Sequence, residues 1–394
     1  MLMALSLSYL MMPGIVQAGH DEGMAAYNKK DYATALKEWK PLATQGDARA
    51  QFSLGVMYEN GQGVPQDYKE AVKWYRLAAD QGNAGAQVNL GAAYEYGQGV
   101  PQDYKEAVKW YRLAANQGND TAQLNLGVAY EYGRGVPQDH KEAVKWYRLA
   151  ADQGNAGAQI NLGSMYERSQ GVPQDHKEAV KWYRLAADQG NDTAQYNLGV
   201  VYEYGRGVPQ DYKEAVKWNR LAADQGHARA QNNLGVAYTK GLGVASNRVV
   251  GYALYNLSAS IDPSDKNSAT ANRAAVVTSM PTKEIEAAQN LTREIAKPGN
   301  LLKALDKYAK NPVIKEKSKP VAIRDNADLT PVTPPSGDSF PARPAKRPGV
   351  VSCNTSCINA DCRRTYDDGQ KVRFQAQRKF DPFSGDWKFD SGNC

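Results

Sequence analysis

Apolar residues recur at helical spacing in short stretches along most of this chain, and glycine-rich segments separate the stretches. Residues 120–155 illustrate the pattern. One apolar stripe, at positions i, i+4, i+7 and i+8, consists of Ala122, Leu126, Ala129 and Tyr130. Gly127 lies beside this stripe, where a missing side chain lets another helix approach closely. The spacing predicts a first helix that ends at the glycine-rich segment 133–137.

A second helix is predicted to begin after Asp139, because an aspartate side chain accepts hydrogen bonds from the first free backbone N–H groups of a helix. Glu142 follows three residues later, as in a capping box. The apolar stripe of this helix consists of Ala143, Trp146 and Ala150. Neither short helix would persist alone in water. We therefore expect an antiparallel hairpin that buries its remaining face on the next hairpin.

This unit returns every 36 residues, and its tryptophan marks the period. The tryptophans at this spacing are Trp74, Trp110, Trp146, Trp182 and Trp218. Trp39 lies one residue off the grid, and Leu254 takes the position after Trp218. A fixed period of this length predicts a solenoid of stacked units, which needs no single central core.

The repeated pattern is Ala-Gln-x-x-Leu-Gly-x-x-Tyr, Gly-x-Gly-Val, Asp-x-x-x-Ala-x-x-Trp, Ala-Ala-x-Gln-Gly. It resembles the Sel1-like repeat, a relative of the tetratricopeptide repeat found in exported bacterial proteins. Six copies occupy residues 48–263 of an array over 19–263, and residues 22–47 resemble a degenerate opening unit. The resemblance implies an all-α fold, a right-handed α/α superhelix with its first helices on the concave face, and an adaptor role. Ser169 departs from the pattern, because it replaces the first loop glycine of its copy.

The copies differ mainly along one face of the first helix, at positions i, i+4 and i+8. The resemblance places this face in the groove of the superhelix and predicts an apolar and aromatic trough for a protein or peptide partner. The predicted groove residues are Phe52, Val88, Leu124, Ile160, Tyr196, Asn232, Tyr96, Tyr132 and Tyr204. The glutamates predicted to edge the trough are Glu59, Glu95, Glu131, Glu167 and Glu203. The alternative is that these positions vary freely and pack between repeats.

The N-terminus has the pattern of an export signal over residues 1–18. The apolar run 2–12 is too short to span a bilayer, and small residues precede a cleavage site after Ala18. No Lys or Arg precedes the run, and a buried N-terminal helix is the alternative. The mature chain is thus expected in the bacterial periplasm or outside the cell, without a membrane span.

Three segments follow the array. Residues 264–310 keep a helical pattern and are expected to cap the solenoid. Residues 311–350 hold eight prolines and an excess of basic side chains, which predicts an extended linker that can contact an anionic envelope surface. Residues 351–394 form a small module with alternating apolar positions typical of β-strands.

All four cysteines lie in that module: Cys353, Cys357, Cys362 and Cys394. An even number of cysteines in a small segment that is expected to be exported predicts two disulfides, and the sequence leaves three pairings open. Zinc is the alternative, although the module lacks the Cys-x-x-Cys pairs of common zinc sites. The histidines occupy repeat positions too far apart to share a metal, so no metal or cofactor is expected.

Charge and motifs narrow the function further. The net charge of +6 comes from the linker and the C-terminal module, so no basic stripe marks the array as a nucleic-acid binder. The sequence has no Gly-x-Ser-x-Gly, His-Glu-x-x-His or phosphate-binding loop, so we expect an adaptor rather than an enzyme. Two alternatives stay open: a glycan or small-ligand binder working through the cysteine module, and a β-lactam-interacting enzyme, as reported for cysteine-rich relatives.

Overall fold

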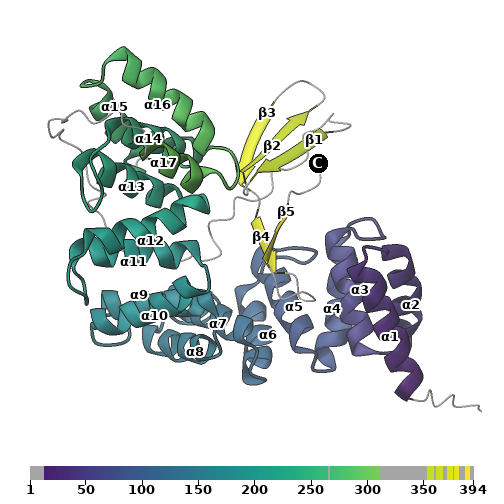
Figure 1. Cartoon of the computed structure of the whole chain (residues 1–394). Helices are drawn as coiled ribbons and strands as arrows, with labels where there is room; N and C mark the ends of the chain where they lie inside the picture. The colour runs from purple at the N-terminus through teal and green to yellow at the C-terminus, as the bar shows by residue number, and fades with distance from the viewer. Residues whose placement is uncertain are drawn as a thin grey trace, which may run out of the picture. The chain divides into compact units, whose positions relative to one another are not determined.

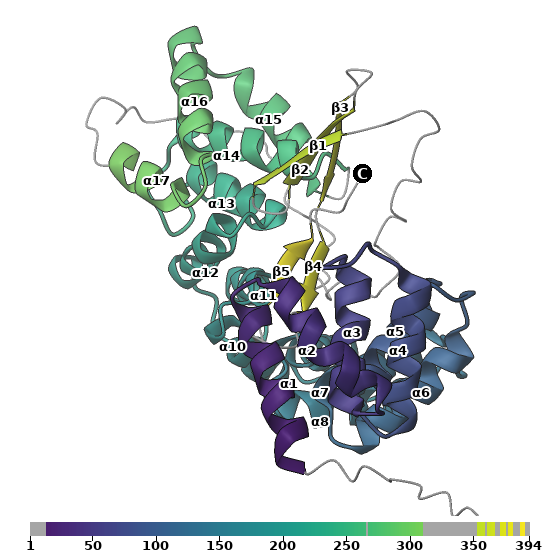
Figure 2. The same ribbon diagram turned by 90° about the vertical axis from the view of Figure 1, so that its right-hand side faces the viewer.

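A computed structural model describes residues 13–264, 267–309 and five strands between 353 and 390, with side chains for 19–264 and 267–308. The chain divides into two compact units, of which the first ends at Asn155. Its hairpins are α1 (Pro13–Asn28) with α2 (Tyr32–Thr44), α3 (Ala48–Asn60) with α4 (Tyr68–Asp80), α5 (Ala84–Tyr96) with α6 (Tyr104–Asn116), and α7 (Asp120–Tyr132) with α8 (His140–Asp152). Each second helix but the last packs on the first helix of the next hairpin, so the helices stack in chain order (Figures 1 and 2).

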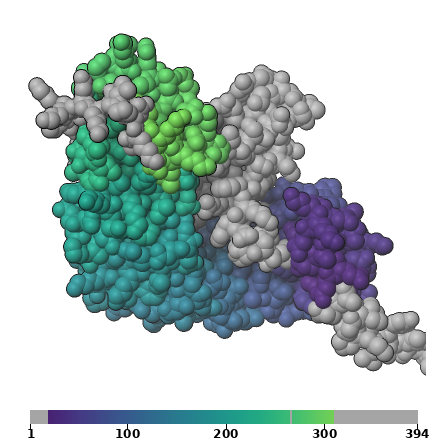
Figure 3. Space-filling model, in the orientation of Figure 1, coloured from purple at the N-terminus to yellow at the C-terminus, as the bar shows by residue number. Residues whose placement is uncertain are grey.

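The second unit begins at Ala156 and continues the same hairpins. They are α9 (Ala156–Arg168) with α10 (His176–Asp188), α11 (Asp192–Tyr204) with α12 (Tyr212–Asp224), and α13 (Ala228–Lys240) with α14 (Arg248–Ile261). Three further helices follow: α15 (Ala269–Val277), α16 (Thr282–Ile295) and α17 (Leu301–Ala309). Leu291 and Ile295 of α16 join Leu254 and Leu257 of α14 in one buried cluster. Figure 3 shows α11 to α17 as one continuous surface.

Aspartate caps start the second helix of every hairpin except α14, which is capped by Asn247. Asp139 accepts hydrogen bonds from the N–H groups of Lys141 and Glu142, at 2.9 and 3.1 Å. In a capping box the side chain of Glu142 would accept the backbone N–H of Asp139. Here that N–H donates to the carbonyl of Tyr130 at 2.9 Å. The side chain of Glu142 pairs with Lys145 instead. This bond to Tyr130 joins the second helix to the first, so the cap also fixes the hairpin.

In five of the seven hairpins described above, a tyrosine of the second helix packs against a glycine of the first helix, and Asn219 takes this position in α11–α12. Tyr147 is fully buried against Gly127, where an added Cβ would lie 2.5 Å from the tyrosine ring. The predicted stripe of the second helix is confirmed at Ala143 and Ala150, which are fully buried, whereas Trp146 is half-buried. The equivalent Trp182 and Trp218 are buried. Trp39 takes the tyrosine position in the opening hairpin and packs on Gly23 in the same way. Its one-residue offset from the tryptophan grid follows from this.

Buried glutamines connect successive hairpins. The side-chain amide of Gln87 donates to the carbonyl of Ala79 in the preceding hairpin at 3.1 Å. Its oxygen accepts from Gln117, at the end of its own hairpin, at 2.8 Å. The same bonds recur at Gln123, which donates to Ala115 and accepts from Gln153. These bonds satisfy polar groups that burial would otherwise leave without partners.

The C-terminal strands form two antiparallel groups. One has the order β1 (Cys353–Ile358), β2 (Asp361–Tyr366) and β3 (Lys371–Gln375). The other pairs β4 (Gln377–Phe380) with β5 (Trp387–Asp390). The apolar run 2–12, the linker 311–350 and Cys394 lie outside the described residues. Among the helices that are described, none is both long and apolar enough to cross a membrane.

Candidate binding face

The first helices of the first unit carry three of the predicted groove residues in half-buried positions. Phe52 lies against the next hairpin, where a Cβ added to Gly85 would be 3.1 Å from its ring. Val88 packs against the buried cluster that contains Leu126 of the following hairpin. Leu124 is half-buried in the same way. Side chains at this position are thus partly covered by the next repeat and partly accessible to solvent.

In the second unit the same position is closed, which corrects the expectation of a groove along the whole array. Ile160 is buried in a cluster with Leu198 of the next first helix. The ring of Tyr196 stacks on His227 with centroids 4.6 Å apart and is 1% exposed. Asn232 is also buried. Its side-chain oxygen accepts a hydrogen bond from Asn272 of α15 at 3.1 Å. These three residues pack within the array and offer no binding surface.

The tyrosines at the last variable position are exposed. Tyr96 and Tyr132 are each 41% exposed in the first unit, and Tyr204 is 39% exposed in the second. In the first unit each of these tyrosines lies on the same helix face as two half-buried apolar residues. We call this surface the α5–α7 face. It consists of Val88, Ala92, Tyr96, Leu124, Val128 and Tyr132.

An arginine beside this face holds one of its tyrosines. The guanidinium carbon of Arg134 lies 5.3 Å from the centre of the Tyr132 ring, and its Nη1 is 3.6 Å from Glu95 of the preceding repeat. The second unit repeats the arrangement, with Arg206 over Tyr204 and 3.0 Å from Glu167. Our sequence reasoning missed these arginines. The sequence signal for them is the loop Gly-Arg-Gly in the third and fifth copies, where the first two copies have Gly-Gln-Gly.

Four of the five glutamates predicted to edge the groove instead accept hydrogen bonds from tyrosines of the second helices, namely Glu59, Glu95, Glu131 and Glu167. The hydroxyl of Tyr111 donates to Glu95 at 2.6 Å, and that of Tyr147 donates to Glu131 at 2.5 Å. Burial and the Glu95 carboxylate raise the pKa of Tyr111 well above its usual value, so its hydroxyl remains a donor. Asn125 also hydrogen-bonds to Tyr111. Asn125 thus joins its repeat to the preceding one.

A small cavity lies next to the α5–α7 face. Its volume is about 40 Å³, and its lining includes Glu59, Tyr75, Asn89 and Ala92. Ala92 is smaller than the valine found at this position in four other copies. A volume of this size holds only a few water molecules. It adds no ligand pocket to the face.

The second helices expose a separate row of leucines. Its members are Leu77, Leu113 and Leu149 in the first unit and Leu185 and Leu221 in the second. In the capped repeat Leu257 holds the same position and is buried with residues of α16 and α17. This row shares no helix with the α5–α7 face.

The side chains that are described bring together no group of three His, Cys, Asp or Glu residues able to hold a metal. The helical hairpins repeat along the chain. The same caps, tyrosine–glutamate bonds and glutamine bonds recur in successive hairpins, and this arrangement defines a helical-repeat solenoid. Six consecutive matches to the Sel1 repeat, at residues 48–83, 84–119, 120–155, 156–191, 192–227 and 228–262, cover more than half of the chain. The chain belongs to the Sel1 repeat family. Proteins of this family act as scaffolds for protein interaction and are typically non-catalytic.

One solved structure agrees with this fold, and a second one is similar in sequence. The chain is 34% identical to a Sel1 repeat protein from Oxalobacter formigenes, with a TM-score of 0.57 over 61% of this chain and 96% of that one. It is 26% identical to c5321, a protective antigen of uropathogenic Escherichia coli with an SLR fold, with a TM-score of 0.40 over 78% of this chain and 89% of that one. No curated protein sequence matches the chain.

Proposed function

We propose that this protein is an exported adaptor that binds a protein or peptide partner on the α5–α7 face. The observation that carries the proposal is the exposure of Tyr96 and Tyr132 beside half-buried apolar side chains on neighbouring first helices. Tyrosine is enriched at protein interfaces because a rigid ring offers a large contact area with little loss of conformational entropy. The family's role as an interaction scaffold supports the same reading.

The chemistry of the face suits a partner segment with apolar anchors. Val88, Ala92, Leu124 and Val128 supply aliphatic contacts, while the carboxylates of the neighbouring repeats are already engaged by tyrosine and arginine. A mainly apolar surface with aromatic ends fits a helical or extended segment that inserts one or two large side chains. The face is confined to the first unit, so its proposed partner contacts two repeats and not the whole array.

Photo-crosslinking in cells tests this function. A benzophenone amino acid is placed at position 96, 132 or 113 of the full chain, and proteins joined to it after illumination are identified by mass spectrometry. Leu113 is a matched control, because it is 47% exposed but lies on the second helix of the same hairpin as Tyr96. We expect the same partner at 96 and 132 and its absence at 113.

Substitution completes the test. A Tyr96→Ser/Tyr132→Ser double variant is expected to lose that partner in co-purification, whereas Leu113→Ser retains it. Equal partner recovery from the double variant and the wild type would show that the face is not the binding surface. Adducts that form only with probes in residues 351–394 would favour the alternative in which the cysteine module is the binding part.

Export is part of the same proposal. Helix α1 begins at Pro13 and runs across the expected cleavage site, so cleavage after Ala18 would leave residues 19–28 as a shorter first helix. That remainder keeps His20, whose carbonyl accepts the Trp39 indole N–H at 3.1 Å. The opening hairpin therefore retains its main contact after cleavage. Intact mass of the protein from the periplasmic fraction tests this, and a mature chain starting at Gly19 is expected.

A further inference from the structure

The backbone of the C-terminal strands places two cysteines directly opposite each other. In the antiparallel pair β1–β2, Cys357 is in register with Cys362, and Cys353 is in register with Tyr366. Opposed residues of antiparallel strands have Cα atoms about 4.5–5.5 Å apart. That separation falls within the range of about 4.4–6.8 Å found across disulfides. We propose that Cys357 and Cys362 form one disulfide and that Cys353 pairs with Cys394.

The register excludes the other two pairings. Cys353 and Cys357 lie four residues apart on the same strand, a separation of about 13 Å at 3.3 Å per residue. Cys353 and Cys362 are equally displaced along the strands, because Cys362 lies opposite Cys357. Neither distance can be bridged by a disulfide without moving the backbone. Cys394 is then the remaining cysteine of the chain and the partner of Cys353.

The same spacing argues against a shared zinc site. The sulfur ligands of one zinc each lie about 2.3 Å from the metal, so the residues that bear them must be neighbours. Cys353 is displaced from both Cys357 and Cys362 by four strand residues. A single zinc ion could not contact all three cysteines while this register is kept.

Bridge formation needs an oxidant, which we take to be a low-molecular-weight or protein disulfide. Each bridge forms when two cysteine thiols exchange with one donor disulfide, which leaves as two donor thiols. Two electrons and two protons thus pass from the chain to the donor for each bridge. In the cell this step rests on the proposed export, because disulfides persist in oxidising compartments.

The test is made on the purified full chain, oxidised with a mixture of oxidised and reduced glutathione, so its result does not depend on export. After alkylation of free thiols, the protein is cleaved before aspartate without reduction. The relevant products are residues 338–360, 361–366 and 390–394. We expect all three joined by disulfides. Joining of 361–366 to 390–394 without 338–360 would overturn the proposal, because it requires a Cys353–Cys357 bridge.

A substitution separates the remaining alternative. Thr355→Asp adds a cleavage site between Cys353 and Cys357, at a position in register with Arg364, so that an acidic residue is paired with a basic one. We expect residues 355–360 joined to 361–366, and 338–354 joined to 390–394. Residues 338–354 joined to 361–366, or four alkylated thiols, would overturn the assignment. The unsubstituted chain, fragmented further in the mass spectrometer, gives the same comparison if the variant does not fold.

A pair of double variants provides a control by counting thiols. Cys353→Ala/Cys394→Ala keeps the opposed pair and is expected to have no alkylated thiol after oxidation. Cys353→Ala/Cys362→Ala keeps two cysteines from different proposed bridges and is expected to have both thiols alkylated. Equal alkylation of the two variants would contradict the proposed pairing.

Discussion

Ser169 adopts a backbone conformation that glycine adopts in the other repeats. Its φ is 57°, beside values of 66° at Gly97 and 70° at Gly133. The loop therefore keeps its shape, although a side chain in the left-handed region costs about 1–2 kcal/mol. We expect Ser169→Gly to raise the free energy of unfolding of the array by about 1 kcal/mol, because glycine's greater unfolded-state entropy offsets part of the gain.

The measurement is the urea midpoint of the full chain. The matched control is Gly133→Ser, which introduces the same side chain at φ 70° and is expected to lower the midpoint. A lower midpoint for Ser169→Gly would show that the serine hydroxyl, 3.4 Å from the carbonyl of Val172, matters more than the backbone.

His227 makes one helix start sensitive to pH. Its Nδ1 accepts the N–H of Ala230 at 3.2 Å, in a position where the earlier repeats have asparagine. Burial lowers the pKa of His227, the nearby Arg229 lowers it further, and Asp192 and Asp262 raise it. The unfolded chain therefore binds the proton more readily, and stability falls as the pH drops below about 6.5.

His227→Asn should remove this loss, because an amide does not titrate. Between pH 7 and pH 5 we expect the wild type to lose more stability than the variant, by at most about 1.4 kcal/mol per pH unit. Thermal unfolding at both pH values measures the difference. His20 titrates in both proteins and cancels in the comparison. Identical pH dependence would contradict a role for His227.

At the level of the hairpin, the tyrosine–glutamate pair is expected to contribute most where the glutamate is most buried. Glu131 is 5% exposed, whereas Glu59 is half-buried. Tyr147→Phe removes the hydroxyl bound to Glu131 and should cost about 1–3 kcal/mol, because a buried acceptor loses its donor. Tyr75→Phe removes the same bond to Glu59 and should cost less. Urea midpoints of the two variants test this order, and an equal effect would show that burial does not control the cost.

The sequence predicted the hairpins because stripes such as Ala122 and Leu126 record which side of a helix is buried. It did not separate Trp146 from Tyr147, since adjacent residues differ by only about 100° around a helix and both can fall near the apolar side. The glycine facing Tyr147 decides between them, and that contact crosses helices. Periodicity within one helix carries no such information.

The exposure of the predicted groove residues could not be predicted either, because it depends on contacts between helices. Variation at Ile160 and Tyr196 marked a face of the first helix, but exposure depends on how closely successive first helices pack. The stacking of Tyr196 involves His227, the residue that caps the next hairpin, and the bond to Asn232 comes from Asn272 of α15. A comparison of copies identifies positions that vary. It does not show which of them reach solvent.

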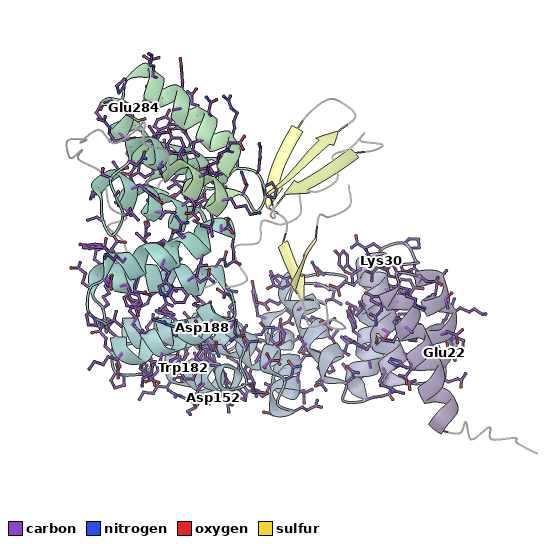
Figure 4. All side chains as sticks on the ribbon, viewed as in Figure 1. Glu22, Lys30, Asp152, Trp182, Asp188 and Glu284 are labelled. Carbon is purple, nitrogen blue, oxygen red and sulfur yellow. The ribbon has the colours of Figure 1, made fainter. Side chains whose placement is uncertain are left out.

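For the whole molecule, the helices after the last hairpin should be required for stability. Leu291, Ile295 and Leu305 pack in the cluster with Leu254 and Leu257 of α14. Arg248 binds Glu284, which is labelled in Figure 4, at 3.3 Å. Each large aliphatic side chain removed from such a cluster forfeits about 1.5–3 kcal/mol of burial. A chain ending at residue 263 should therefore unfold at a lower temperature than one ending at 309 and should self-associate.

Circular dichroism and light scattering on the two truncated chains measure this difference. The chain ending at 309 is the control, since it also lacks the linker and the cysteine module. Equal unfolding temperatures and monomeric behaviour of both chains would show that the last hairpin needs no cap.

The ion pairs of Arg134 with Glu95 and of Arg206 with Glu167 have a consequence for how the array changes length in evolution. Each pair joins a repeat beginning Asn-Asp-Thr-Ala to a preceding repeat beginning Asn-Ala-Gly-Ala, so the pairing recurs with a period of two repeats, or 72 residues. Loss of residues 120–191 would join Asn119 to Asp192 and offer Arg206 the carboxylate of Glu95. Duplication or deletion of such a double unit creates no new type of junction, whereas loss of one of these repeats alone removes one of these ion pairs.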